Sequence, residues 1–269
     1  LPAERTAYDK ILSFLVFLDS IQTANLPNIG AYITANEVNL CLSIQAFQEC
    51  VHSQSYSYML DTICSPVERN DILYQWKTDE HLLRRNTFIG NCYNEFQEQK
   101  DAPTLLRVMM ANFILEGIYF YSGFMFFYNL SRNGKMPGSA QEIRYINRDE
   151  NTHLWLFRNI ILELQKEQPE LFGTENVRMM RELLEEGVLE GRRTFGNIMK
   201  YIKMAASGNF GNMISVVLAS ILLPFLPLKP VQILTQNLLC DFAQLGIPFD
   251  RVDESYLSQP RKWDTGSIQ

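Results

Sequence analysis

The sequence predicts an all-α protein, a helical bundle with a carboxylate-bridged dinuclear metal site in its core. Helix-start signals recur along the chain, with little of the alternation typical of β-strands between them. Two Glu-x-x-His pairs use two of the three histidines, and two further acids stand alone in apolar stretches. With 269 residues, 46% of them hydrophobic, the chain is long enough to bury a large core.

Four helices are expected in the first part of the chain. The first should end near Asn25 to Pro27, where the turn-forming residues interrupt an apolar pattern. Thr34 with Glu37, and Ser65 with Glu68, have the spacing of capping boxes and predict two further helix starts. The four predicted helices cover about residues 6–24, 34–64, 68–78 and 80–98.

Three more helices are expected in the remainder. A long apolar one should end before Asn133 and Gly134, and Ser139 with Glu142 predicts the start of the next. These helices are predicted at about residues 103–129 and 140–166, and from about residue 174 onward. We divide the chain into a metal-binding helical domain, residues 1–203, and a C-terminal helical and tail segment, residues 204–269.

Composition and charge exclude some classes of protein. A net charge of −6 and a pI near 5.2 argue against a nucleic-acid-binding surface. Five scattered cysteines without a CxxC pair fit a reducing cytoplasm better than a disulfide framework. The chain starts at Leu1 without a basic and then apolar leader, so we expect no signal peptide and a trimmed N-terminus.

The two Glu-x-x-His pairs are Glu49 with His52 and Glu150 with His153. On a helix, a step of three residues places both side chains on one face, so each pair offers a metal one oxygen and one nitrogen. A single pair would more often be an ordinary surface carboxylate beside a satisfied histidine. Two pairs together with two isolated acids instead favour a metal site.

The isolated acids are Asp19 and Glu116. Asp19 is the only charged residue between Lys10 and Glu37, and Glu116 is the only one between residues 107 and 132. A lone buried carboxylate is unfavourable or takes up a proton, so a positive charge is expected beside each. The alternative for the helix of Glu116 is a transmembrane span, which its length allows.

Four carboxylates and two imidazoles suit iron or manganese rather than structural zinc, which prefers thiolates. Such sites bind and reduce dioxygen, which leaves iron storage, substrate hydroxylation and radical generation open. Tyr56 lies four residues after His52, and Glu49, His52 and Tyr56 fall within about 60° of one helix face. This favours a radical-generating site over the alternative, a tyrosine packed in the core.

Four sequence runs resemble the radical-generating beta subunit of class I ribonucleotide reductase, a ferritin-like protein. The similarity extends over about residues 5 to 195. The runs are Phe17–Gln22, Gln45–Tyr56, Leu115–Tyr121 and Ile146–His153.

The resemblance implies a role for each candidate residue. Asp19, Glu49 and His52 would bind the metal nearer the tyrosine, which is Tyr56 and would carry the radical. The second metal would be bound by Glu116, Glu150 and His153, with Glu49 and Glu150 able to bridge. The apolar pocket that shields the radical would be formed by Phe120, Phe124 and Ile146. Asp149 would orient a ligand histidine and relay proton-coupled electron transfer.

The resemblance also implies the activity. A dinuclear site of two iron ions, two manganese ions or one of each would activate dioxygen or a reduced oxygen species. The oxidant would pass to a cysteine of the large alpha subunit, which makes deoxyribonucleotides. We expect a cytoplasmic homodimer that binds neither nucleic acid nor membrane, with a flavodoxin-like activator if the metal is manganese. The alternatives are a related di-metal oxidase acting on a bound apolar ligand, and an inactive structural or regulatory paralogue.

Two features depart from the family. There is no tryptophan before Trp76, where the family has a pathway tryptophan upstream of the first ligand. The residues after about 200 match poorly, and Tyr256 lacks the flanking sequence needed to assign it the family's relay role. The uncharged run Met204–Leu228 is long enough for a membrane span, but Pro224 and Pro227 favour a buried or interface helix.

Overall fold

The computed structural model describes every residue except 1, 225–227, 245–250 and 261–269. Within the described residues every regular element is helical, which agrees with the predicted all-α class. The elements are α1 Pro2–Tyr32, α2 Asn36–Asp61, α3 Pro66–Leu73, η1 Gln75–Lys77, α4 Glu80–Gln99, α5 Ala102–Ile114, η2 Leu115–Phe120, α6 Tyr121–Arg132, α7 Pro137–Glu167, η3 Pro169–Phe172, α8 Thr174–Leu222, α9 Pro230–Gln244 and α10 Glu254–Leu257.

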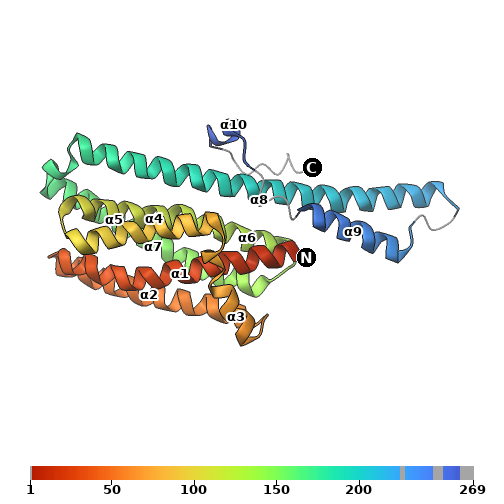
Figure 1. Cartoon of the computed structure of the whole chain (residues 1–269), viewed down its shortest axis with the longest axis horizontal. Helices are drawn as coiled ribbons and strands as arrows, with labels where there is room; N and C mark the ends of the chain where they lie inside the picture. Colours follow the sequence, from red (N-terminus) through yellow and green to blue (C-terminus); the bar gives the residue numbers. More distant parts are fainter. Residues whose placement is uncertain (1, 225–227, 245–250, 261–269) are drawn as a thin grey trace. The chain divides into compact units, whose positions relative to one another are not determined.

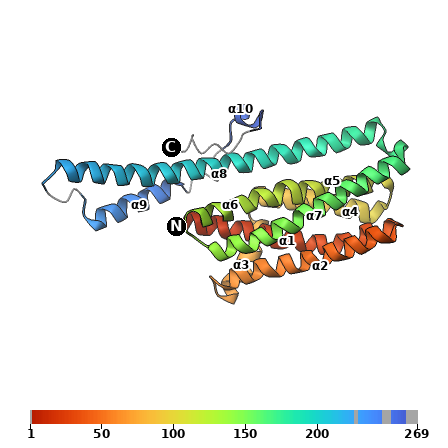
Figure 2. The same cartoon turned by 180° about the vertical axis from the view of Figure 1, so that it is seen from behind.

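The chain divides into two compact units, one of residues Ala7–Val188 and one of Leu1–Thr6 with Leu189–Gln269. In the first unit, α1, α2, α7 and the continuous α5–η2–α6 helix run side by side, and α4 packs on α5 (Figures 1 and 2). Their inward faces share one buried apolar core. The predicted boundary after residue 203 lies inside α8.

Helix α1 continues past the predicted stop at Asn25 to Pro27 and ends at Tyr32. Pro27 removes one backbone hydrogen bond, at a cost of about 3 kcal/mol. Leu26 and Ile29 on either side of it are fully buried, and burying each stabilises the fold by roughly 1.5–3 kcal/mol. Packing of these two residues therefore offsets the effect of the proline.

Two of the three predicted capping boxes are wrong, and the third caps a helix start. Helix α2 begins after Ala35 without a side-chain cap. Helix α7 begins at Pro137, whose fixed φ suits the first helical position, and Ser139 instead shares a hydrogen bond with Tyr8 at 2.9 Å. Ser65 does accept a hydrogen bond from the backbone N–H of Glu68 at the start of α3.

The segment Ala102–Arg132 is long and apolar enough to cross a membrane by length and composition alone. It contains the π-helical turn η2, which carries Glu116. In the structure, 72% of its most apolar stretch of 18 residues is buried inside the protein. This segment is therefore a core helix of the bundle, as its side chains in the common core also indicate.

The second unit contains the greater part of α8, together with α9 and α10. Asn212 of α8 accepts a hydrogen bond from Gln236 of α9 at 2.5 Å. Arg192 donates to the backbone carbonyl of Leu257 in α10 at 2.7 Å. A side chain at Gly196 would collide with Val252, so glycine permits the close approach of that segment to α8.

Candidate metal centre

The six expected metal-binding residues come from four different helices and are all buried. Each helix contributes either one acid or one Glu-x-x-His pair, in chain order. They are Asp19 of α1, Glu49 and His52 of α2, Glu116 of η2, and Glu150 and His153 of α7.

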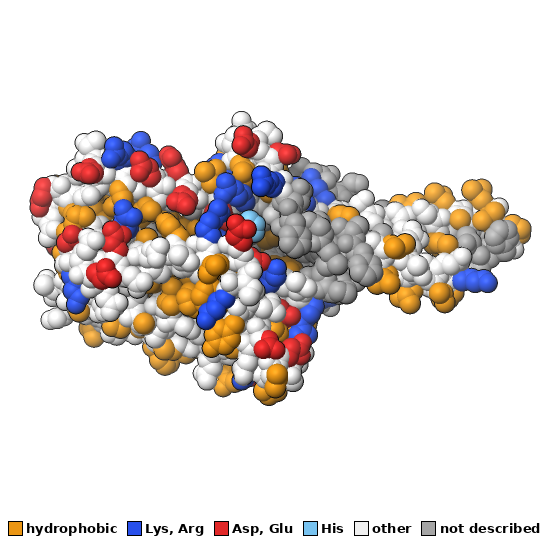
Figure 3. Space-filling model, viewed as in Figure 1, with side chains coloured by type: hydrophobic (Ala, Val, Ile, Leu, Met, Phe, Trp, Pro, Cys, Tyr) orange, Lys and Arg blue, Asp and Glu red, His pale blue; other side chains and the backbone are white. Residues whose placement is uncertain are grey.

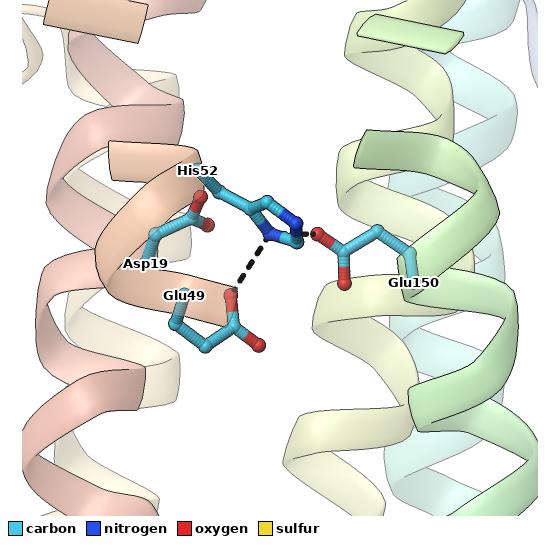
Figure 4. Close-up of side chains that lie close together, drawn as sticks. All are labelled: Asp19, Glu49, His52 and Glu150. Atoms are coloured by element: carbon cyan, nitrogen blue, oxygen red, sulfur yellow. Dashed lines mark ion pairs between the residues drawn. The ribbon is translucent and has the colours of Figure 1, made fainter. Parts of the chain in front are cut away.

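Their ligand atoms form two overlapping groups, and within each group all of the atoms lie within 4.8 Å of one another. One group adds Asp19 and His52 to the pair Glu49 and Glu150, and Figure 4 shows these four side chains converging. The other group adds Glu116 and His153 to the same pair. Two neighbouring metal positions thus share two glutamates, which is the arrangement that bridging carboxylates require.

Both imidazoles direct Nδ1 toward the acids. His52 Nδ1 lies 3.2 Å from Glu150 Oε1 and 3.5 Å from Glu49 Oε2. His153 Nδ1 lies 3.1 Å from Glu150 Oε2 and 3.3 Å from Glu49 Oε1. Nδ1 is therefore the nitrogen that each histidine presents to a metal.

The other ring nitrogen of each histidine meets an acceptor outside the cluster. His52 Nε2 lies 3.4 Å from Asp149 Oδ2, and His153 Nε2 lies 3.0 Å from Gln48 Oε1. Because both partner atoms are acceptors, the Nε2 proton points to them and Nδ1 remains the ligand. Asp149 had been expected beside a ligand histidine, whereas no role had been expected for Gln48.

Without metal, the charges of the site oppose one another. Burial raises the pKa values of Asp19 and Glu116 well above the usual carboxyl range, and the neighbouring glutamates add to this effect. Burial opposes the charged forms of the histidines, yet the nearby carboxylates of Glu150 and Glu49 raise the pKa of His52 and of His153 to about 11. The two imidazolium groups in this way balance part of the negative charge.

The donor set fits two iron or manganese ions. Five of the six residues have at least one buried side-chain atom without a hydrogen-bond partner, which is rare unless a ligand is missing. Four carboxylates also balance the charge of two divalent ions, and oxygen and imidazole donors suit iron and manganese. The unpaired atoms are Asp19 Oδ1 and Oδ2, Glu49 Oε2, His52 Nδ1, Glu116 Oε2 and Glu150 Oε1.

A buried amide network surrounds Glu116. The side-chain amides of Gln22 and Gln45 both donate to Glu116 Oε1, at 2.9 and 2.7 Å. Gln22 also donates to Asn112 and accepts from the hydroxyl of Tyr93. Sequence reasoning gave these residues no role, although Gln22 and Gln45 stand three and four residues from a ligand and thus on its helix face.

Tyr56 and the expected apolar pocket are fully buried. Tyr56 has no exposed surface, its hydroxyl has no hydrogen-bond partner, and burial raises its pKa well above 10. Phe120 and Phe124 pack with ring centroids 6.0 Å apart. Both rings and Ile146 belong to the same continuous buried core as Tyr56.

Comparisons with known proteins agree with this geometry. The sequence profile of the family described as "Ribonucleotide reductase, small chain" matches residues 1–206. The ribonucleoside-diphosphate reductase subunit beta of Treponema pallidum is 79% identical over 184 residues, which are 68% of this chain and 52% of that protein. The chain thus spans about half the length of the curated relatives that it matches.

Solved structures give the same result. The ribonucleotide reductase R2 subunit from Clostridium botulinum superposes with a TM-score of 0.69 and 53% identity, over 71% of this chain and 61% of that one. The dimanganese(II)-NrdF of Streptococcus sanguinis superposes with a TM-score of 0.58 and 25% identity, over 70% and 65%. The bundle that carries the six donors therefore has known structural relatives.

A second, separate similarity covers about a third of the chain. The P-type magnesium-transporting ATPase 1 of Salmonella typhimurium is 57% identical over 86 residues, which are 32% of this chain and 10% of the ATPase. The corresponding protein of Escherichia coli K12 is 56% identical over the same length. Because the small-chain profile matches more than half of the sequence and the donor set lies inside the matched residues, this chain belongs to the ribonucleotide reductase small-chain family.

Proposed function

We propose that this chain is a beta subunit of ribonucleoside-diphosphate reductase that generates and stores the oxidant used by a large alpha subunit. The observation that carries the proposal is the buried six-residue donor set with Tyr56 on the same helix as one Glu-x-x-His pair. Asp19, Glu49 and His52 would hold one metal ion. Glu116, Glu150 and His153 would hold the second, and Glu49 and Glu150 would be shared between the two positions.

The two metal ions, when bound, reduce dioxygen or a reduced oxygen species and supply a one-electron oxidant. The chain itself holds the ions, excludes water and protects the product of oxidation. Tyr56 carries that product as a phenoxyl radical. Its raised pKa keeps the phenol neutral beforehand, so its oxidation must also release a proton.

The apolar surroundings of Tyr56 support storage of a radical. Phe120, Phe124 and Ile146 are almost completely buried and carry no group that readily gives up a hydrogen atom or electron. As members of the buried core that contains Tyr56, they would keep solvent reductants and water from the phenol. We assign these three residues a shielding role on that basis.

Asp149 positions His52 and links the site to the surface. Its Oδ2 faces His52 Nε2, its side chain is 21% exposed, and its Oδ1 accepts from Arg148 at 3.2–3.3 Å. A carboxylate in this place fixes the ring of the ligand histidine. It also offers a route by which a proton and an electron reach the buried site together when the stored oxidant is passed on.

The partners follow from the proposed activity. The subunit acts with a large alpha subunit in the cytoplasm and forms a homodimer, and a manganese form uses a flavodoxin-like activator. The similarity to beta subunits of ribonucleoside-diphosphate reductase supports the first partner, and the dimanganese structure from Streptococcus sanguinis supports manganese as one of the usable metals. The donor set itself accepts iron, manganese or one of each.

Electron paramagnetic resonance after metal loading and exposure to dioxygen tests the proposal. Iron-loaded protein should show a narrow organic radical signal that is lost in Tyr56→Phe, with metal content unchanged. Tyr58→Phe, which alters an exposed tyrosine on the same helix, should keep the signal. A narrow signal that survives Tyr56→Phe would exclude Tyr56 as its carrier, and a metal-coupled signal that survives would place the oxidant on the ions.

A further inference from the structure

The C-terminal part of the chain remains outside the proposed function. The small-chain profile ends at residue 206, and 63 residues follow it. The metal-binding residues lie between positions 19 and 153, and the structure divides after Val188. The C-terminal unit therefore contributes none of the six candidate metal ligands.

This unit contains a long stretch without charge. No charged residue lies between Lys203 and Lys229. Residues Met204–Leu222 of this stretch are helical, as the last part of α8. At 1.5 Å per residue this helix is about 28 Å long, close to the roughly 30 Å hydrocarbon thickness of a bilayer.

Apolar side chains of α8 and α9 are exposed. Ile221 and Leu222 are 74% and 81% exposed, and Val231 is 72% exposed. Figure 3 shows hydrophobic side chains crowded over this end of α8 and α9. Patches of this kind on a protein in water normally mark a surface that is covered by a partner or by lipid. The exposed apolar residues of the two helices include Val217, Leu218, Ile221, Leu222, Leu234 and Leu239.

We propose that the hairpin of α8 and α9 inserts into a lipid bilayer, with Met204–Leu222 crossing the apolar layer. Lys203 and Lys229 mark the two ends of the uncharged stretch, so a crossing helix places both ammonium groups at the lipid headgroups. A shallower insertion would leave Lys229 in hydrocarbon, which is strongly unfavourable. Spanning therefore fits the positions of the charges better than lying on the surface.

The hairpin also carries polar residues. Asp241 is the one charged residue of α9, and in hydrocarbon we expect its carboxyl group to be protonated. Asn212 and Gln236 bind each other across the two helices, as polar side chains between membrane helices do. The backbone of α8 is helical throughout, so its N–H and C=O groups are satisfied internally. This inference replaces the expectation from sequence that no membrane is involved, while the metal-binding bundle remains on the cytoplasmic side.

Flotation of the full-length chain with phosphatidylcholine vesicles tests the inference. The protein should float with the vesicles and stay with them in 1 M salt and in alkaline carbonate, which remove peripheral proteins. The double change Val217→Asp and Leu218→Asp should lower the floating fraction about tenfold or more, because charge in hydrocarbon is unfavourable. The matched control is Leu40→Asp with Phe47→Asp, two exposed apolar residues of α2, and it should float normally.

Metal content and helical circular dichroism confirm that each variant is folded, and they are independent of flotation. A chain that fails to float, or a double variant that floats like the unaltered chain, overturns the inference. If the chain without lipid forms a discrete oligomer that the double change dissociates, and it does not float, a second copy covers this surface instead. Failure of the flotation test leaves metal binding untouched, so it does not bear on the proposed reductase activity.

Discussion

The two carboxylate oxygens of Glu116 have different surroundings. Oε1 accepts hydrogen bonds from the amides of Gln22 and Gln45, whereas Oε2 is buried without a partner. Only Oε2 is therefore available to a metal without breaking hydrogen bonds. The amides restrict Glu116 to binding through one oxygen.

Replacing Gln45 with leucine should weaken the metal position that Glu116 serves. Hydrogen-bond partners of metal ligands typically contribute about 10- to 100-fold to metal affinity, so we expect a loss of that size at one of the two positions. Competition with a metal-binding dye measures the affinity. Gln54→Leu, at an exposed position of the same helix, should leave both metal affinities unchanged. A Gln45→Leu variant that binds both metal ions as tightly as the unaltered chain would contradict a positioning role.

The convergence of the six candidate metal ligands could be predicted from sequence, but that of the amides could not. Asp19 and Glu116 stand out because they interrupt long uncharged stretches, and a buried carboxylate needs compensation. Gln22 and Gln45 carry no charge, and glutamine is common on helix surfaces. Their role depends on which faces of α1, α2 and α5–η2–α6 meet, and that is a property of the folded bundle.

At the scale of the helices, positions and lengths were predicted better than ends. Helix α4 agrees with its predicted range, and Asp79 caps its start. The stop of α6 at Arg132 agrees with the stop signal of Asn133 and Gly134. Helix α1 continues through Pro27 because its neighbours are buried, and tertiary packing of this kind leaves no local signal. The π-helical turn around Glu116 was also not predicted, although such turns often occur at functional sites.

Gly187 tests the packing of α8 on α5 within the metal-binding unit. A Cβ at this position would lie 2.7 Å from Cγ2 and 3.0 Å from Cγ1 of the buried Ile114. Gly187→Ala should therefore lower the free energy of unfolding by about 1–3 kcal/mol, more than the gain in helix propensity. Gly90→Ala in α4 meets nothing within 4 Å and should raise stability by about 0.5–1 kcal/mol. Urea unfolding measures both, and equal effects would refute the close contact.

At the scale of the whole molecule, stability without metal should depend on pH. His52 and His153 have folded pKa values of about 11 against an unfolded value of 6.5, so their contribution is complete below pH 6.5 and is lost as pH rises toward 11. The raised pKa values of Asp19 and Glu116 act in the same direction, since their protonated forms favour the folded state. The free energy of unfolding should fall by about 1.4 kcal/mol per pH unit for each proton retained only by the folded chain.

Metal loading should remove this dependence between pH 7 and pH 9. Bound metal displaces the protons of both histidines, so folded and unfolded chains then differ less in the number of protons that they hold. Urea unfolding of metal-free and metal-loaded protein at three pH values gives the comparison. A metal-free protein whose stability is constant or rises over this range would contradict the assigned protonation states.

The division of the chain into two units was only partly foreseeable. The uncharged stretch after Lys203 was visible in the sequence, and the poor match to the reductase family after about residue 200 indicated a separate segment. Its prolines favoured a buried or interface helix. Apolar side chains of α8 and α9 are exposed, and a proline pattern alone does not show what covers such a surface.

The central claim is that the six buried donors form one site for two metal ions, and metal analysis of the purified chain tests it most directly. After loading with iron or manganese, the chain should contain two ions, and Glu116→Ala should contain one because the second position loses a ligand. Glu163→Ala, an exposed acid on α7, should retain both. A folded chain that binds no metal, or a Glu116→Ala variant that keeps two ions, would contradict the account.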